Sequence, residues 1–358
     1  MWRHTLLRFW QIGLLLLIVL FVSGCAHNKR SEAVRAYSWK SLKGHVISSV
    51  AWSPDGEYIA FVSAHEKEVY DETTSKPLNS NIWLVKASDI DRGNALAKII
   101  TLSRSQGIPS TLFWISNDQI GWSSIRRDVG FTFVSTTIKS PNPNRLMNNN
   151  FKLFQSKAMG SIYAPDDVYF DIESHSLLFS GSVNSDEGSS RNLVCIYGID
   201  AKELSIVPQK LDIEGGVSLC SCSREKLDAI QFYVAGYRST GSSLDGILWR
   251  SDSPFLERAE IIYRGKIAFP RVSPKGELIA WLEDIPKNPK MDSIVVYNQT
   301  LKKKVAIAEI STNWIGVTPV GGCPFSWSPD GKKIAYADGS RIKIVEVPTD
   351  NTPDKRRQ

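Results

Sequence analysis

The chain repeats one ten-residue frame built around a Pro-Asp-Gly turn. The copy near the end runs from Trp327-Ser328-Pro329 through Asp330-Gly331 into the apolar stretch 334–336. Proline presets φ for the first turn position, aspartate can bond its own backbone, and glycine adopts the positive φ that other residues resist. An apolar run thus enters a tight turn and an alternating apolar run leaves it, which predicts a β-hairpin.

Two more strong copies place their serines at Ser53 and Ser273. Ser273 precedes Ser328 by 55 residues, and Ser53 precedes Ser273 by 220 residues, which is four such steps. Weaker copies fill the interval, with anchors at Ser116, Ser174 and Ser223. Six units of about fifty residues have the blade length of a four-stranded β-propeller.

This frame resembles the WD40-like repeat of TolB-type β-propellers. The same frame occurs in the propeller domains of prolyl oligopeptidase relatives and of some pectate-degrading lyases. The six copies cover nearly all of the chain after residue 45. The resemblance implies an all-β chain, a six-bladed β-propeller of four-stranded blades over residues 34–348. It leaves the function open, because one fold hosts many activities.

The N-terminus has the pattern of an export signal. Arg3 and Arg8 precede an apolar core over residues 12–22, and Val22-Ser23-Gly24-Cys25 follows. The last four residues resemble a bacterial lipobox, which predicts a lipoprotein signal peptide over 1–24. Cys25 would then carry the lipid, including palmitate, and 25–33 would form a tether. A plain signal peptide and an uncleaved anchor helix stay open, although the apolar core is short for a bilayer span of about 20 residues.

Localisation and charge follow from the same segment. In the resembled class, aspartate after the lipidated cysteine retains the protein in the inner membrane, and here that position is Ala26. We therefore expect a lipid anchor in the outer membrane, facing the periplasm. The formal net charge is +6, and it falls to +4 without Arg3 and Arg8, too mild to indicate nucleic acid. The polar tail 349–358 is expected to be solvated.

The sequence shows few signs of catalysis. It has no G-x-S-x-G nucleophile elbow, no Gly-rich phosphate loop before a helix and no H-E-x-x-H. Five histidines are scattered along it, so we expect no metal site and no cofactor. Asp55, Asp118 and Asp330 recur where the turn needs them, which competes with a paired-carboxylate interpretation. We expect the protein not to be an enzyme.

The cysteines allow two interpretations. Cys220 and Cys222 lie two residues apart on a predicted inner strand, where Cα atoms about 6.5 Å apart stand at the limit for a disulfide. One hypothesis pairs Cys195 with Cys220 or Cys222 across the interface of blades three and four, which an exported location permits. The alternative is that these three and Cys323 are small buried hydrophobic residues.

Loop lengths indicate a working face. The connections between second and third strands are long in four predicted blades, at 65–80, 183–191, 236–245 and 284–292, as is the last interblade loop at 311–322. Rigid scaffolds present functional loops, and aromatic and Met side chains are favoured contact anchors. The candidate partner-binding residues are Tyr70, Tyr237, Met291 and Trp314. Neutral variation in loop length is the alternative.

Two functions compete. The first is a non-catalytic envelope lipoprotein whose propeller binds a protein partner, since TolB-type propellers often act as interaction modules. The second is a ligand-binding or carbohydrate-processing propeller with its site at the channel mouth. That function requires His, Arg and carboxylates converging on the inner strands, which instead carry Ser, Cys and aromatic residues.

The last expectation concerns how the ring closes. The predicted sixth blade has strands at 324–327, 333–337 and 342–347, followed by a polar stretch unsuited to a strand. Residues 34–42 form one strand too many at the other end. We predict that 34–42 pairs with 342–347 as the closing strand of blade six. The alternative is a flexible extension of the tether.

Overall fold

The computed structural model describes residues in the part of the chain from Ala36 to Pro348. They are residues 36–38, 42–65, 81–91, 96–101, 108–126, 130–139, 144–145, 168–171, 173–184, 190–201, 203–207, 216–226, 229–240, 243–253, 255–285, 288, 291–311 and 322–348. Among them, no helix is long and apolar enough to cross a membrane. Cys25 and the predicted signal peptide lie outside the described residues.

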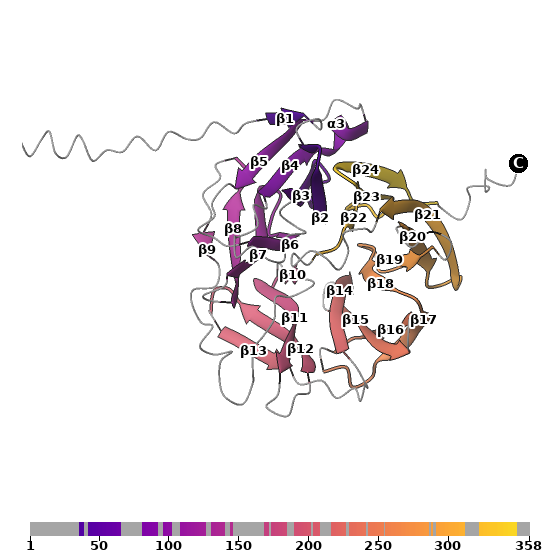
Figure 1. Cartoon of the computed structure of the whole chain (residues 1–358). Coiled ribbons are helices and arrows are strands. Elements are labelled where there is room, and N and C mark those ends of the chain that lie inside the picture. Colours follow the sequence, from indigo (N-terminus) through magenta and orange to yellow (C-terminus); the bar gives the residue numbers. More distant parts are fainter. Residues whose placement is uncertain are drawn as a thin grey trace, which may run out of the picture. The chain divides into compact units, whose positions relative to one another are not determined.

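These residues form six antiparallel sheets (Figure 1). Sheet one has the order β1 (Ala36–Ser38), β5 (Leu96–Thr101), β4 (Asn81–Lys86), β3 (Tyr58–His65) and β2 (His45–Trp52). Sheet two has β6 (Ile108–Trp114), β7 (Gln119–Arg126), β8 (Gly130–Thr137) and β9 (Asn144–Arg145). Sheet three has β10 (Val168–Asp171), β11 (Ser176–Asn184), β12 (Ser190–Gly198) and β13 (Glu203–Val207).

The second half of the chain continues the series. Sheet four has β14 (Gly216–Lys226), β15 (Ala229–Thr240), β16 (Ser243–Ser251) and β17 (Glu260–Gly265). Sheet five has β18 (Ala268–Val272), β19 (Leu278–Asp284), β20 (Met291–Asn298) and β21 (Lys303–Ser311). Sheet six has β22 (Phe325–Trp327), β23 (Lys333–Asp338) and β24 (Arg341–Glu346). One short helix, α3 (Ala87–Asp91), follows β4 and was not predicted.

The first strands of the six sheets form a closed cycle of contacts. β2 contacts β6, β6 contacts β10, β10 contacts β14, β14 contacts β18, β18 contacts β22, and β22 returns to β2. The remaining strands of each sheet follow outward in chain order, with the extra strand β1 outermost in sheet one (Figure 1). The prediction of an all-β chain is confirmed.

The repeated turn holds each hairpin through its serine. The Ser53 hydroxyl donates to the Asp55 carboxylate at 2.6 Å and accepts from the Tyr58 amide at 2.9 Å. The copy at Ser328 reproduces both bonds, with Asp330 at 2.6 Å and the Lys333 amide at 2.9 Å. Both serines are buried. The repeat therefore recurs because buried hydroxyl and turn carboxylate satisfy the same backbone groups each time.

The core lies between neighbouring sheets, as the second strand β3 shows, because it is buried on both faces. In β3, Ile59 and Phe61 pack into a cluster shared with sheet six, whereas Ala60 and Val62 pack into one shared with sheet two. Side chains of a strand alternate between faces, so one continuous apolar run serves two interfaces. The same arrangement joins sheets four and five, and sheets five and six.

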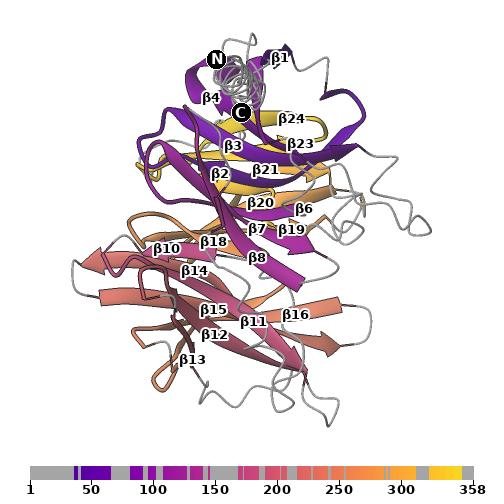
Figure 2. The ribbon, with the colours of Figure 1, turned by 90° about the vertical axis from the view of Figure 1, so that its left-hand side faces the viewer.

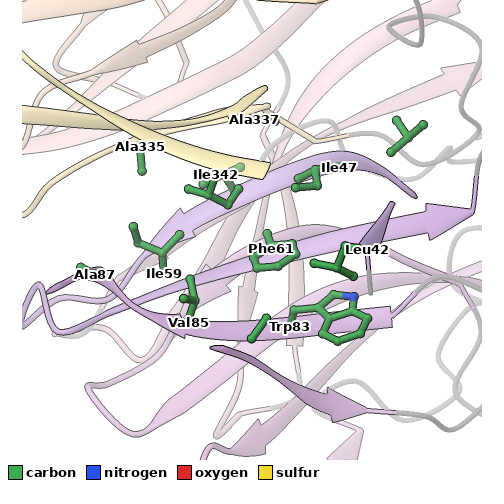
Figure 3. Close-up of a cluster of buried hydrophobic side chains, with 13 residues drawn as sticks. Leu42, Ile47, Ile59, Phe61, Trp83, Val85, Ala87, Ala335, Ala337 and Ile342 are labelled. Carbon is green, nitrogen blue, oxygen red and sulfur yellow. The ribbon is translucent and has the colours of Figure 1, made fainter. Parts of the chain in front are cut away.

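The first and last sheets close the cycle by packing face to face. Ala335, Ala337 and Ile342 of sheet six meet ten buried residues of the sheet-one region, including Leu42 and Ala87. Figure 3 shows side chains from both sheets pointing into this seam cluster. Phe61 and Trp83 stack within it, with centroids 6.3 Å apart and rings 8° from parallel.

The predicted closing strand is wrong. Ala36–Ser38 pairs with β5 of sheet one, with Tyr37 opposite Ala97, and not with β24. Leu42, four residues beyond β1, is buried in the seam cluster beside Phe61 and Trp83, which places the preceding segment at sheet one. Among the described residues, sheet one consequently has five strands and sheet six has three, whereas the other four sheets have the expected four strands each.

Three of the predicted long loops are shorter than expected. β15 extends to Thr240 and β16 begins at Ser243, so most of 236–245 is a continuing ladder in which Tyr237 faces Gly246. β11 and β12 still pair at Asn184 and Ser190, and β19 and β20 at Asp284 and Asp292. Backbone hydrogen bonding does not require apolar side chains, so these polar segments continue as strands and the hairpins are longer than predicted (Figure 2). Residues 66–80 and 312–321 lie outside the described residues.

Candidate functional site

The inner strands enclose a small pocket. Its volume is about 160 Å³, and strands of sheets one, two, five and six line it. Its polar lining side chains are those of Ser49, Thr111, Arg271 and Ser326, with Cys323 and Trp327 beside them. A pocket of this size admits a small molecule or one side chain of a partner.

Tryptophans of the repeat tie adjacent sheets together around this pocket. The Trp114 indole donates to the Ala51 carbonyl at 3.2 Å, and the Trp327 indole donates to the Arg271 carbonyl at 3.0 Å. Ladder register makes these tryptophans equivalent, because Trp114 faces Ile120 and Trp327 faces Ile334. Each of these two therefore bonds to the preceding sheet, whereas the equivalent Trp52 donates to the Gly56 carbonyl of its own turn at 3.1 Å.

The hydroxyls in the pocket also hold the ring closed. Ser326 Oγ accepts from the Trp52 amide at 3.0 Å, and the Val50 amide donates to the Cys323 carbonyl at 2.9 Å. Ser49 Oγ accepts from the Leu112 amide at 3.4 Å. Gly322 has a φ of 135°, and a Cβ there would lie 2.7 Å from the Ser49 Cβ. Only glycine lets the chain enter sheet six this close to β2.

Arg271 is a charged residue in the lining of the pocket. It is half-buried, and its Nη1 donates to the Pro270 carbonyl at 3.1 Å. An arginine is charged at all physiological pH values, so this pocket is suited to an anionic group.

The recurrent aspartates serve the turns. Asp330 accepts from Ser328 and from the Lys332 amide at 3.0 Å, and these bonds lower its pKa. Asp118 accepts from Ser116 at 2.8 Å. The structural interpretation of these carboxylates is thus supported over a paired catalytic one.

The predicted disulfide is wrong. Cys195 is a free, fully buried thiol on β12, and burial raises its pKa to about 12. Cys323 is also buried, and its thiol lies 4.0 Å from the Phe269 carbonyl oxygen. Both behave as small hydrophobic residues, because an apolar interior disfavours the thiolate. The side chains of Cys220 and Cys222 lie outside the described residues, although their strand β14 is described.

Comparison with known proteins identifies the fold. No family model matches the sequence, and no curated protein matches it. Oligogalacturonate lyase from Vibrio parahaemolyticus superposes with a TM-score of 0.52 at 11% identity, over 88% of this chain and 94% of that one. The chain is a β-propeller. TolB from Acinetobacter baumannii aligns with a TM-score of 0.49 at 12% identity, over 85% of this chain, which spans 61% of the TolB chain. An oligogalacturonate lyase in complex with manganese scores 0.47 at 12% identity. The predicted resemblance is confirmed at the level of fold.

Two of the four predicted partner-binding residues lie in the described part of the propeller. Met291 begins β20 and is half-buried, at the end where β20 leaves β19. Tyr237 lies in β15, opposite Gly216 of β14 and Gly246 of β16. Tyr70 and Trp314 lie outside the described residues. The structure therefore does not bring these four into one described site, and their role stays a prediction.

No cluster of three or more His, Cys, Asp or Glu side chains with metal-binding geometry occurs in the described part of the propeller. His45 contacts the Ser63 hydroxyl at 3.2 Å, and His175 contacts Asp200 at 2.8 Å, in different blades.

Sequence reasoning missed Arg271 as a pocket residue. By register it corresponds to Ala51 and Ser326, since all three face an alanine on the next strand, Ala280, Ala60 and Ala335 respectively. The sequence signal that could have identified this pocket residue is an arginine at a repeat position where other copies have Ala51 or Ser326. Exposed apolar residues on the outer strands were also missed, because exposure depends on the neighbouring blade.

Proposed function

We propose that this protein is a non-catalytic lipoprotein of the bacterial envelope whose propeller binds a protein partner. The lipid on Cys25 would hold it in the outer membrane, facing the periplasm. The observation that carries the proposal is where polar and apolar side chains lie on the propeller. Inner polar groups are committed to the scaffold, whereas outer strands and turns expose large apolar side chains.

The exposed residues are in neighbouring blades. Phe255 and Ile261 of blade four are 42% and 43% exposed, and Leu301 and Val305 of blade five are 45% and 46% exposed. A protein partner would bury these accessible apolar side chains. The hydroxyls of Ser49 and Ser326, in contrast, already accept backbone hydrogen bonds between blades. This supports a scaffold that presents a contact surface.

The channel pocket supports a second candidate, the binding of a small anionic ligand. Its volume of about 160 Å³ and the guanidinium of Arg271 suit a compound of a few heavy atoms that carries a carboxylate. A carbohydrate-processing activity, the other form of this candidate, would act at the same place.

Affinity capture separates the two candidates. The tagged full-length protein is purified from detergent-solubilised envelopes after reversible cross-linking, with an Arg271→Ala variant in parallel. We expect one protein in stoichiometric amount, captured equally by both forms. If no protein is captured and a small acid is released by wild type but not by the variant, the protein-binding proposal fails and the ligand candidate replaces it.

Metabolic labelling tests the anchor. We expect radiolabelled palmitate to enter the wild-type protein and not a Cys25→Ala variant, with the wild type found in outer-membrane fractions. Equal labelling of both forms would overturn the lipid-attachment site.

A further inference from the structure

The polar lining of the pocket between the inner strands is suited to an acceptor with negative charge. Arg271 has a positive charge and five N–H donors, and its Nη1 donates to the Pro270 carbonyl at 3.1 Å. The described residues that line the pocket include no carboxylate. Charge-assisted hydrogen bonds to a guanidinium are strongest when the acceptor is an anion. The lining therefore favours a carboxylate over a neutral or cationic group.

Ser49 supplies a second donor in the same pocket. It is 2% exposed, and its Oγ accepts from the Leu112 amide at 3.4 Å. A hydroxyl also has one proton to donate, and no described group accepts the proton of Ser49. Gly322 keeps the space beside it open, since a Cβ there would lie 2.9 Å from Ser49 Oγ. An acceptor oxygen in the pocket would complete the hydrogen bonding of this buried hydroxyl.

These two donors belong to blades that flank the last blade of the ring. Arg271 lies on β18 of blade five and Ser49 on β2 of blade one, and β22 of blade six contacts both strands. Ser326 stands at the register position of Arg271, and its Oγ reaches the Trp52 amide of the next blade at 3.0 Å. Arg271 accordingly extends from blade five towards blade six. One ligand bound to both donors would link blade five to blade one across β22.

The apolar part of the lining limits what the rest of the ligand can be. Leu112, Val272 and Phe325 contribute to it, and all three are buried. An aliphatic end that leaves water for this lining adds to the affinity. The pocket volume is about 160 Å³, which restricts the ligand to a few heavy atoms. A carboxylic acid of about two to four carbons combines the charged end with the apolar end.

We propose that the pocket binds a short aliphatic carboxylate between the Arg271 guanidinium and the Ser49 hydroxyl, and that the bound acid holds blades six and one together. The opened ring separates the two donors, so the acid binds the closed ring and stabilises it by mass action. This inference rests on the second candidate function, ligand binding in the channel. It names the ligand class and the effect of the ligand, and it does not require a protein partner.

Amide exchange measured by NMR on the full-length protein in detergent tests the effect on the seam, with propionate as the probe. The Val50 amide donates to the Cys323 carbonyl and the Trp52 amide to Ser326 Oγ, so both report on contact between blades one and six. Saturating propionate should slow their exchange at least tenfold and that of β15 amides in blade four less than twofold. Propionamide, which has the same shape without the charge, should have no effect. An equal effect of propionamide, or equal slowing in β15, would overturn the inference.

Matched substitutions test the two donors by calorimetry. Arg271→Gln removes the charge of the guanidinium and should raise the Kd of propionate at least tenfold, and Ser49→Ala should raise it at least threefold. Arg264→Gln changes an exposed arginine of blade four and should change the Kd less than twofold. Equal Kd values for wild type and Arg271→Gln would overturn the site. If Arg271→Gln does not fold, the comparison of propionate with propionamide on wild type decides.

Other outcomes separate this inference from its alternatives. Inorganic phosphate has no aliphatic end and should bind at least fivefold more weakly than propionate, and tighter binding of phosphate would overturn the ligand class. A captured protein partner without any effect of propionate would overturn this inference and leave the protein-binding function standing. Propionate binding without a captured partner would leave the inference standing and sink the protein-binding function.

Discussion

The seam between blades six and one closes the propeller, so a cavity there should be costly. Ile342 is 3% exposed and packs in the cluster with Ile47 and Leu42. Ile342→Ala removes three carbon atoms, which is about 2.4 kcal/mol of lost burial at roughly 0.8 kcal/mol for each. The cavity adds to that, so we expect a total of about 3–4 kcal/mol.

Urea unfolding of the full chain, followed by tryptophan fluorescence, measures this loss. Leu301→Ala is the control, since Leu301 is 45% exposed, and it should cost less than about 0.5 kcal/mol. Hydrogen exchange should show the variant loosened first at β2 and β22, the strands that meet at the seam. A loss below about 1 kcal/mol for Ile342→Ala would refute closure by packing and would reopen closure by strand exchange.

Three further predictions concern titratable groups. Burial and the facing Asp284 raise the pKa of Asp292 to about 6, so folding favours its protonated form and stability falls as pH rises from about 4 to 6. Asp292→Asn should therefore stabilise the protein at pH 8 by roughly 1 kcal/mol, discounted for partial exposure, with no gain at pH 3. The pKa of Asp330 is lowered, so its contribution is present above the ordinary carboxyl pKa and is lost on acidification below it. Urea midpoints of Asp330→Asn and wild type should converge at low pH and diverge at pH 7. Cys195 should resist iodoacetamide at pH 8 in the folded state and react in urea without reductant, because it is buried and unbridged; failure to react in urea would indicate a bridge.

Part of the site could be anticipated from the sequence and part could not. The turn aspartates were assigned to structure because they recur at one position of the frame, and the bonds of Asp330 support that. Arg271 escaped notice, because its significance comes from pocket residues that lie 50 or more positions away in the chain. The pocket is a property of how blades meet.

The sequence by itself determined the β-propeller class, the strands and the hairpins, since turn chemistry and two-residue alternation act within ten residues of chain. Tertiary structure decided which edge the N-terminal strand joined. Ala36–Ser38 had suitable composition for either blade, and burial of Leu42 in the seam set its position. It also decided that Cys195 stays a free thiol and that polar segment 236–245 continues a ladder. Strand pairing depends on which backbone groups are brought within reach, and the amino-acid pattern of one segment does not specify its neighbour.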